Sequence, residues 1–304
     1  MEKNFFYNKL KEVLTESEVK RNEPMSLHTT FKIGGKADYF VKPKTMEHLV
    51  YAIKCCKEND IPYYIIGNGS NLLVSDKGYR GAIIQIYKNF NQVEINGCRV
   101  RAQAGILLSR LARLIMEAGL EGFEFASGIP GTLGGAVFMN AGAYGGEMKD
   151  VVEAITVITH QGDLIELPKE ALELDYRSSI LQKEDYVAVS IDLIFKEGCK
   201  KIIKSRIAEL DDLRRLKQPI EKPSAGSAFK RPEGHYASKL IMEAGLKGYS
   251  IGGAQVSEKH CGFIVNKGDA TAKDVIMLME HIKNTVKEKF GVELEEEIKL
   301  LGEE

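Results

Sequence analysis

The sequence predicts an α+β fold divided into more than one domain. Over the first two thirds of the chain, short runs with the alternation typical of strands and longer runs with the apolar spacing of helices follow each other irregularly, which is typical of an α+β arrangement. A length of 304 residues is large for a single hydrophobic core and indicates two or three domains. We place the start of the last domain near Gly198.

Composition and charge describe an ordinary globular protein. Hydrophobic residues make up 44% of the chain and charged residues 28%, with a formal net charge of -1. These values argue against a disordered chain and against a mainly electrostatic nucleic-acid binder, so a charged ligand needs a local site. The cysteines include no CxxC pair and the histidines no metal-type spacing, so we expect neither a disulfide framework nor a metal. With no apolar signal region and no run long enough to span a bilayer, the expected location is the cytoplasm.

The first elements follow from apolar spacing and turn residues. Residues 1–23 form an arm with a weak helical stripe, and its charged remainder is expected to be a solvated face. From Pro24 to Pro43 the chain is expected to be extended, with a turn at Gly34 and Gly35 leading into the first strand. Thr45 is the predicted N-cap of a helix, because the following apolar residues recur at helical spacing. These residues are Met46, Leu49, Val50, Ile53 and Cys56.

The remaining elements follow from the same two periodicities. Strands are predicted where short apolar or alternating runs occur, at residues 63–66, 82–86, 93–95, 100–104, 151–159, 164–167, 186–195 and 292–301. Helices are predicted where apolar residues recur every three or four positions, at residues 107–118, 199–217, 236–244 and 271–290. Residues 161–163 are the predicted hairpin turn, and Thr271 is a predicted helix cap.

Two glycine-rich segments are the candidate ligand-binding elements. The longer one, Gly122 to Met148, carries apolar residues among its glycines, so it is not a flexible linker. Glycine admits positive φ and close backbone approach, so such a loop lets N–H groups gather around a phosphate. Tight turns between packed strands are the alternative. The second segment, residues 67–71, opens directly from a strand and offers N–H, hydroxyl and amide groups. Together the two segments suit a ligand with a diphosphate and ring systems.

Seven segments, in order, resemble the motifs of the UDP-N-acetylenolpyruvoylglucosamine reductase family of flavoenzymes. They are TTFKIGGKADYF, GNGSNLLVSDKGYRGAII, FASGIPGTLGGAVFMNAGAYGGEM, YRSS, PSAGSAFKRP, GGAQVSEKHCGFIVN and GVELEEEIKLLG. Their order and spacing agree from about Pro24 to Gly302, nearly the whole chain, and the chain is most similar to the shorter subclass of the family. A similar FAD domain occurs in flavoproteins of the vanillyl-alcohol oxidase type, so the fold alone does not fix the reaction.

The resemblance implies that successive parts of the chain form domains with different functions. After the arm at 1–23, residues 24–197 would form an FAD-binding domain of the vanillyl-alcohol oxidase/PCMH type with two α+β subdomains. Residues 198–304 would form a C-terminal α+β substrate-binding domain. The cofactors implied are bound FAD and NADPH as hydride donor, and the substrate is a UDP-sugar whose enolpyruvyl group is reduced to give UDP-N-acetylmuramate for peptidoglycan synthesis. Neither nucleic acid nor membrane is an expected partner, and a monomer is favoured.

The resemblance also assigns residues to the cofactor and the substrate. The residues implied to hold FAD are Gly67, Asn68, Gly69, Ser70, Asn71, Gly128, Gly131, Thr132, Gly134, Gly135 and Ala143. Arg215, Lys230 and Arg231 are candidates for binding the diphosphate of the substrate. Where many members of the family have FKNP, this chain has FKRP, so a cation at Arg231 replaces an amide.

Three catalytic residues are implied by the same motifs. Arg177 of YRSS would stabilise the enolate that forms when hydride reaches C3 of the enolpyruvyl group, because a guanidinium stays protonated and binds carboxylate through paired N–H groups. Ser227 of GSAF would give the proton at C2. Glu297, two residues before the final KLL, would either polarise the enol ether or hold Arg177 and a water in place. Glu295 is the nearest alternative.

Each of these residues also has a structural explanation. Arg177 by itself suits a solvent-exposed ion pair worth roughly 0 to 1 kcal/mol, and Ser227 a surface turn. The acidic run ending at Glu297 suits a solvated strand edge. Two rival functions follow: a flavin oxidase, which would need a different C-terminal domain, and a nucleotide-sugar binder without activity, which would hold no flavin.

Overall fold

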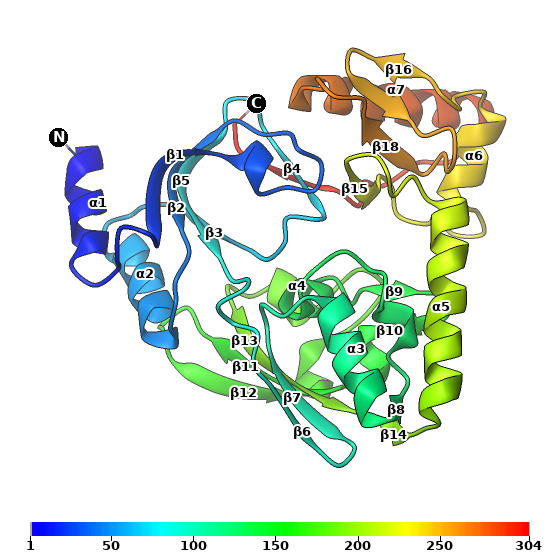
Figure 1. Cartoon of the computed structure of the whole chain (residues 1–304). Coiled ribbons are helices and arrows are strands. Elements are labelled where there is room, and N and C mark those ends of the chain that lie inside the picture. Colours follow the sequence, from blue (N-terminus) through cyan, green and yellow to red (C-terminus); the bar gives the residue numbers. More distant parts are fainter. Residues whose placement is uncertain (1, 304) are drawn as a thin grey trace. The chain divides into compact units, whose positions relative to one another are not determined.

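The computed structural model describes residues 2–303, with side chains from Phe5 onward, and it divides into two compact units (Figure 1). Unit 1 contains the chain up to Arg21 with residues 39–68 and 81–213, and unit 2 contains residues 22–38 and 69–80 with the chain from Arg214 onward. The units interleave along the sequence. The expected functional domains at 1–23, 24–197 and 198–304 are contiguous instead, and they stay a prediction.

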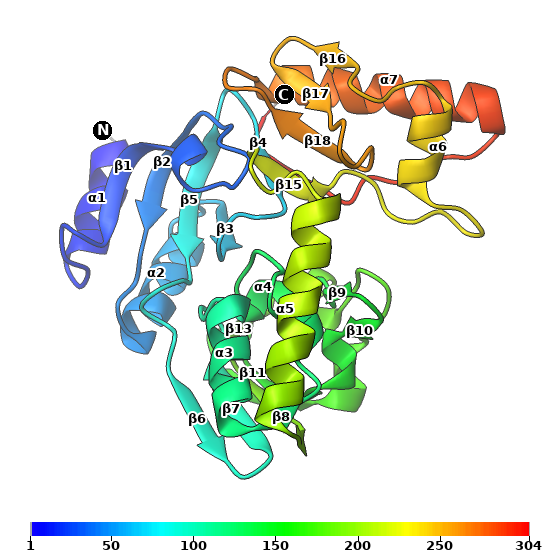
Figure 2. The same cartoon turned by 45° about the vertical axis from the view of Figure 1, so that its right-hand side comes forward.

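Unit 1 is built on a five-stranded antiparallel sheet in the order β12-β11-β13-β7-β6. Its strands are β6 (Val93–Asn96), β7 (Arg99–Gln103), β11 (Val152–Ile158), β12 (Leu164–Pro168) and β13 (Val187–Ile194). Alternate residues of β13 are buried, as expected for a sheet with one face on the core. Helix α3 (Leu108–Ala118) lies along this sheet in both Figure 1 and Figure 2 and buries Leu111 and Ile115. The predicted strands and hairpin are confirmed.

A second sheet has the order β1-β2-β5-β3, and the boundary between the units falls within three of its strands. Its strands are β1 (Val19–Pro24), β2 (Lys36–Val41), β3 (Tyr63–Ile66) and β5 (Tyr79–Gln85). Strands β3 and β5 are parallel. Helix α2 (Met46–Glu58) begins at Thr45, whose Oγ1 accepts a hydrogen bond from His48 N at 3.2 Å. The predicted cap is therefore confirmed.

Unit 2 contains a four-stranded antiparallel sheet in the order β15-β18-β17-β16. Its strands are β15 (Ser224–Ser227), β16 (Ser250–Ile251), β17 (Ala254–Val256) and β18 (Phe263–Asn266). Helix α7 (Ala272–Phe290) packs on β16 and β17, and α6 (Ala237–Glu243) packs on α7 (Figure 2). Thr271 caps α7 as predicted, with Oγ1 accepting from Asp274 N at 3.1 Å. Helix α5 (Lys200–Lys217) carries the chain from unit 1 into unit 2.

The last strand is shorter than predicted. Only Lys299–Leu301 form β19, which pairs in parallel with β4 (Leu72–Val74). Before it, Glu297 N donates to Ala228 O at 2.9 Å and Lys230 N donates to Glu295 O at 2.8 Å. Because the backbone of residues 295–301 is shared between these two partners, no continuous ladder covers 292–301. The α+β class is confirmed, and none of the described helices is long and apolar enough to cross a membrane.

The amino-terminal arm packs apolar residues into unit 1, and most of its described charged residues are at least partly exposed as expected, with Glu18 as an exception. Helix α1 (Glu2–Lys11) buries Phe6 and Leu10, and the chain then turns into β1. Glu18 lies between them with only 1% of its surface exposed. A buried carboxylate needs hydrogen-bond donors, and these come from segments that the local charge pattern does not reveal.

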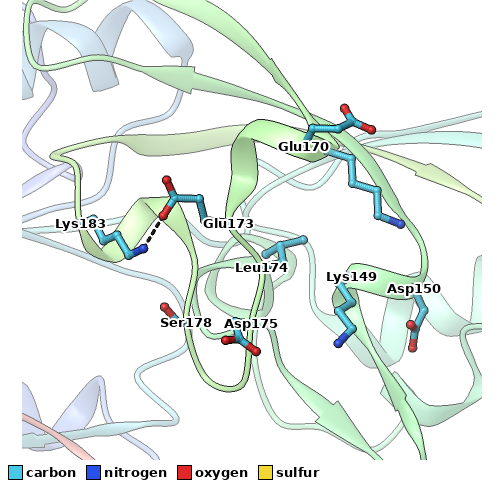
Figure 3. A pocket seen from close by; sticks show the side chains of 9 residues that line it. Lys149, Asp150, Glu170, Glu173, Leu174, Asp175, Ser178 and Lys183 are labelled. Atoms are coloured by element: carbon cyan, nitrogen blue, oxygen red, sulfur yellow. Dashed lines mark hydrogen bonds and ion pairs between the residues drawn. The ribbon is translucent and has the colours of Figure 1, made fainter.

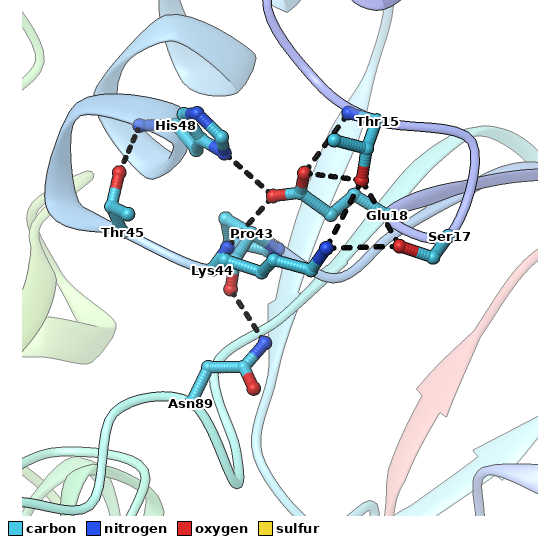
Figure 4. A network of polar contacts seen from close by, with 8 residues as sticks. All are labelled: Thr15, Ser17, Glu18, Pro43, Lys44, Thr45, His48 and Asn89. Atoms are coloured by element: carbon cyan, nitrogen blue, oxygen red, sulfur yellow. Dashed lines mark hydrogen bonds and ion pairs between the residues drawn. The ribbon is translucent and has the colours of Figure 1, made fainter.

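The Glu18 carboxylate is the centre of a polar network (Figure 4). Its Oε1 accepts from Lys44 N at 2.9 Å and lies 2.6 Å from His48 Nδ1. Its Oε2 accepts from Thr15 N at 2.9 Å and from Thr15 Oγ1 at 2.7 Å. Burial alone raises the pKa of Glu18, but the hydrogen bonds from His48, Thr15 and Lys44 outweigh burial and lower the pKa to about 2. The carboxylate therefore joins the end of the arm to the start of α2.

Replacing this carboxylate should make stability depend less on pH. Since the pKa of Glu18 falls from 4.5 to about 2 on folding, its contribution is present above pH 4.5 and is lost as the pH falls toward 2. Glu18→Gln should lower the free energy of unfolding by roughly 2 to 3 kcal/mol at pH 7, with the deficit shrinking below pH 4.5. Urea denaturation over a pH series measures this, with the exposed Glu12→Gln as control. A pH-independent deficit would contradict the role of the charge.

Candidate functional site

The two glycine-rich segments meet within unit 1, at Gly67 and Thr132. Gly67 follows β3, and Thr132 caps α4 (Leu133–Phe138), its Oγ1 accepting from Gly135 N at 3.4 Å. A Cβ added to Gly67 would lie 2.1 Å from Thr132 Oγ1, so only glycine fits there. Gln85 at the end of β5 donates from Nε2 to Gly67 O at 2.9 Å. Gln85 was not predicted, although a polar residue ending an apolar strand was a signal for it.

The longer glycine-rich segment is more ordered than a series of turns. It contains η2 (Glu124–Ala126), α4, and the hairpin of β9 (Gly142–Ala143) and β10 (Gly146–Glu147). Gly134 N donates to Ala104 O at 2.8 Å, and a Cβ on Gly134 would lie 2.9 Å from Ala104 Cβ. Helix α4 was not predicted, because glycine has a low helix propensity. It forms where the absence of a side chain allows close packing against neighbouring backbone.

The other residues expected to hold FAD are spread over both units. Gly128, Gly131 and Ala143 lie in unit 1 with Asn68, whereas Gly69, Ser70 and Asn71 lie in unit 2. Gly131 O accepts from Leu108 N at 3.1 Å. In unit 2, Gly69 has φ +63°, and a Cβ there would lie 2.1 Å from His28 O. At Gly67 and Gly69 alike, the close approach of neighbouring atoms requires glycine.

Arg177 lies at the tip of a tight hairpin in unit 1. Asp175 N donates to Ser178 O at 3.1 Å and Ser178 N donates to Asp175 O at 3.0 Å, so Tyr176 and Arg177 form the turn. Arg177 has φ +54°, a conformation that is uncommon for a residue other than glycine. Its guanidinium carbon lies 5.2 Å from the centroid of the Tyr176 ring, and its side chain is half-buried. The hairpin thus holds Arg177 in a defined, strained backbone conformation.

A hollow of about 780 Å³ opens beside this hairpin (Figure 3). Its lining is almost entirely polar and consists of Lys149, Asp150, Lys169, Glu170, Glu173, Leu174, Asp175, Ser178 and Lys183. Two of its three lysines have local partners, since Lys183 pairs with Glu173 and Lys149 Nζ lies 2.6 Å from Glu147 Oε1. Flavin and nucleotide rings need apolar walls, so this hollow does not suit the ring system of a cofactor.

In unit 2, backbone pairing brings the segments of Ser227 and Glu297 together. Glu297 N donates to the carbonyl of Ala228, the residue after Ser227, and Phe229 forms an antiparallel bridge with Glu296. The side chain of Asn71 joins them, with Nδ2 donating to Glu297 O at 3.1 Å. Three segments that are far apart in the sequence therefore meet, and each contains a predicted site residue.

Exposure to solvent distinguishes Glu297 from Glu295. Glu295 is 72% exposed and pairs with Lys230, and Glu296 Oε1 lies 3.1 Å from Lys283 Nζ. Glu297, like Glu296, is half-buried, so it is better shielded from bulk solvent than Glu295. That placement agrees with the choice of Glu297 over Glu295. The catalytic role of Glu297 stays a prediction.

The cations expected to bind the diphosphate have different surroundings. Lys230 is engaged by Glu295, and Arg231 lies 4.1 Å from the centroid of the Tyr236 ring. Arg215 is exposed near the end of α5. Among the described residues, no group of three or more histidine, cysteine, aspartate or glutamate side chains is placed to hold a metal ion.

The contact between Gly67 and Thr132 makes a testable prediction about packing. Gly67→Ala should destabilise the fold by roughly 1 to 3 kcal/mol because its Cβ would overlap Thr132. Thr132→Ala should cost about 1 kcal/mol as a lost cap, yet the double variant should lose less than the sum. Gly135→Ala is the matched control, since its Cβ would have ordinary room at 3.4 Å and alanine favours the helix. Urea denaturation measures all four; strict additivity would contradict the contact.

Comparisons with known proteins agree with this arrangement over the whole chain. Residues 218–301 match the UDP-N-acetylenolpyruvoylglucosamine reductase C-terminal domain, and residues 37–168 match an FAD binding domain. The UDP-N-acetylenolpyruvoylglucosamine reductase of Alkaliphilus oremlandii is 54% identical, with 100% of both chains covered. That of Clostridioides difficile is 52% identical, with 98% of each chain covered.

A solved structure extends the similarity to three dimensions. The crystal structure of UDP-N-acetylenolpyruvylglucosamine reductase from Thermus caldophilus matches with a TM-score of 0.81 and 38% identity, covering 93% of this chain and 98% of that one. The predicted combination of an FAD-binding domain with a substrate domain is confirmed by these matches. The sequence identity to these reductases over the full chain and the shared fold both show that the chain belongs to the UDP-N-acetylenolpyruvoylglucosamine reductase family.

Proposed function

We propose that this chain is an FAD-dependent oxidoreductase that uses NADPH to reduce the enolpyruvyl group of UDP-N-acetylenolpyruvoylglucosamine. The product is UDP-N-acetylmuramate for peptidoglycan synthesis. The observation that carries this proposal is identity above 50% over the full chain to reductases named for that substrate. The FAD binding domain match at residues 37–168 supports the cofactor.

The chain's own residues fit a cofactor with a diphosphate. A side chain at Gly67 or Gly69 would collide with a neighbouring segment, so the loop keeps bare backbone at these positions, as phosphate-binding loops require. We assign the cofactor to residues 67–71 together with Gly128, Gly131, Thr132, Gly134, Gly135 and Ala143. When bound, FAD supplies a hydride carrier between NADPH and the enolpyruvyl double bond.

Arg177 is the proposed electrostatic catalyst. Reduction of the enolpyruvyl group places negative charge on the substrate carboxylate and its neighbouring carbon. A guanidinium stays protonated and can bind a carboxylate with two N–H groups, so it stabilises this charge without a proton transfer. Because the hairpin already holds the backbone of Arg177 in one conformation, little reorganisation is needed when charge develops.

Ser227 and Glu297 are the proposed residues for protonation. Ser227 would donate its hydroxyl proton to C2, and because serine is a weak acid, the resulting alkoxide needs stabilisation by its surroundings. Glu297, whose N–H bonds to the residue after Ser227, would either polarise the enol ether or position a water. Lys230, Arg231 and Arg215 are the proposed partners of the UDP diphosphate.

Two other functions remain to be distinguished by experiment. A flavin oxidase on the same FAD domain would need a different C-terminal domain, whereas residues 218–301 match the reductase C-terminal domain. A nucleotide-sugar binder without activity would hold no flavin. We also propose a cytoplasmic monomer with no nucleic-acid partner, since a net charge of -1 gives little attraction to phosphate backbones; light scattering tests the monomer.

The visible spectrum of the purified protein tests the function directly. We expect flavin bands that bleach when NADPH is added without oxygen and return when UDP-N-acetylenolpyruvoylglucosamine is added. UDP-N-acetylglucosamine, which lacks the enolpyruvyl group, is the matched control and should leave the flavin reduced. A colourless protein that cannot be reconstituted with FAD would favour the binder, and reoxidation by oxygen alone would favour the oxidase.

Loss of the proposed proton donor should affect only one half of the reaction. Ser227→Ala should slow reoxidation by the enolpyruvyl sugar roughly 10²- to 10⁴-fold, the range expected for general acid catalysis, while flavin reduction by NADPH is unchanged. Glu295→Gln, at an exposed position, should reoxidise the flavin at nearly the wild-type rate, whereas Glu297→Gln should reoxidise it more slowly. Stopped-flow absorbance separates the two half-reactions. Full activity in both Ser227→Ala and Glu297→Gln would refute these roles.

A further inference from the structure

Asn140 is a completely buried polar residue to which the sequence and the comparisons assign no role. It follows α4 in the glycine-rich segment and has none of its surface exposed. Its amide nitrogen Nδ2 donates to Glu147 Oε2 at 2.7 Å and to the backbone oxygen of Asp175 at 3.0 Å. Its Oδ1 accepts from Lys149 N at 2.9 Å. One side chain therefore joins the α4 segment, the β9–β10 hairpin and the residue that opens the Arg177 hairpin.

Two further side chains attach the Arg177 hairpin to the same place. Gln182 donates from Nε2 to Phe138 O at 2.8 Å and to Arg177 O at 2.9 Å. Ser179 Oγ donates to Phe138 O at 2.8 Å, and Ser179 is fully buried. Asn140 holds the hairpin before Arg177, and these two residues hold it after Arg177. The strained turn is thus fixed on both sides to the carboxyl end of α4.

Helix α4 therefore connects the two predicted functional parts of unit 1. Its first turn is capped by Thr132, which contacts Gly67, and its last residue, Phe138, accepts the hydrogen bonds from the Arg177 hairpin. A helix of this length extends only about 9 Å. Within unit 1, the position of the Arg177 backbone relative to Gly67 and Thr132 is consequently set by a short element, with Asn140 at its end.

We infer that Asn140 is a positioning residue that holds the Arg177 hairpin in register with the glycine-rich cofactor segment, an inference that rests on the proposed function of Arg177. The site demands asparagine on two grounds. Its φ of +39° lies in the left-handed region that asparagine tolerates better than most residues. Its partners are two acceptors and one donor, which only an amide can satisfy; a carboxylate would face both Glu147 and a carbonyl oxygen.

The test separates positioning of Arg177 from general stability. In Asn140→Ala and Asn140→Asp, reoxidation of the flavin by the enolpyruvyl sugar should slow roughly 10- to 100-fold, the range expected when a catalytic group is misplaced by about 1 Å. FAD content and the rate of reduction by NADPH should change much less than the rate of reoxidation, because neither depends on Arg177. Stopped-flow absorbance and flavin quantification give these readouts.

Asn266 provides a matched control in unit 2. It is also a buried asparagine, with Nδ2 donating to Phe31 O at 3.1 Å and Oδ1 accepting from Gly268 N at 2.8 Å and Ala270 N at 3.1 Å. Asn266→Ala loses the same number of hydrogen bonds and should lower the melting temperature to a similar extent. It should leave the rate of reoxidation per bound FAD unchanged, since none of these three hydrogen bonds is made to the Arg177 hairpin.

A double variant shows whether Asn140 acts through Arg177. On an Arg177→Ala background, Asn140→Ala should slow reoxidation no further, because the group that it positions is already missing. Multiplicative losses would overturn the inference, and so would an unchanged rate in Asn140→Ala or an equal slowing of both half-reactions.

A failure of the proposed function would have a different signature. If the wild-type flavin is not reoxidised by the enolpyruvyl sugar, the reaction assignment fails, and hydrogen exchange then decides the positioning role. Amides of residues 176–178 should exchange faster in Asn140→Ala than in wild type, but not in Asn266→Ala. Equal exchange in all three proteins would show that Asn140 does not hold the hairpin.

Discussion

The close approach of Gly67 to Thr132 is the constraint on which the organisation of unit 1 depends. A single added carbon at Gly67 would lie 2.1 Å from the Thr132 hydroxyl oxygen, so the end of β3 and the start of α4 can meet only through bare backbone. Once they meet, the remaining geometry follows. The cap starts α4, α4 ends at Phe138, and Phe138 receives the hydrogen bonds of the Arg177 hairpin. The glycine-rich segment that contains Thr132 and α4 thereby also holds the hairpin of Arg177, the proposed electrostatic catalyst.

Unit 2 is organised differently, by hydrogen bonds of the main chain. Ser227 and Glu297 are not joined by any short sequence motif. They are neighbours because Ala228 and Glu297 share a hydrogen bond and because β19 pairs with β4. Backbone pairing places these residues through main-chain hydrogen bonds, with the precision of a sheet. In unit 1 the proposed positioning instead depends on side chains, the buried amide of Asn140 and the half-buried amide of Gln182, which hydrogen-bond to neighbouring segments.

Periodicity and local capping predicted much of the fold. The strand at residues 63–66, the Thr45 and Thr271 caps and the hairpin turn at 161–163 all depend on neighbours within a few positions, and all are confirmed. Helix α4 was missed because packing overrides the low propensity of its glycines. The strand at 292–298 was wrong because its partners, near residue 228, are distant in sequence. Glu18 was expected to be solvated for the same reason: its donors at Lys44 and His48 are invisible to a local charge pattern.

The candidate site likewise contains residues that the sequence indicated and residues that only the structure reveals. Glycine-rich composition indicated phosphate-binding loops, but Arg177, Ser227 and Glu297 could be singled out only through resemblance to a family. Asn140 was accessible to neither approach, since a single amide in an apolar surrounding has no spacing signature, and the signal for Gln85, a polar residue ending an apolar strand, did not indicate its partner. Their importance is visible only when the partners of each buried polar atom are traced in space.

The interleaving of the two units has a consequence for how the protein is made. Phe31, Ile33 and Leu73 belong to the hydrophobic core of unit 2, whose other members all lie beyond residue 224. During synthesis these side chains leave the ribosome with no partner until the last third of the chain has followed, on the order of ten seconds or more later. The early segments must therefore stay exposed and unaggregated through most of translation, which makes the nascent chain a natural client of chaperones that shield apolar surface.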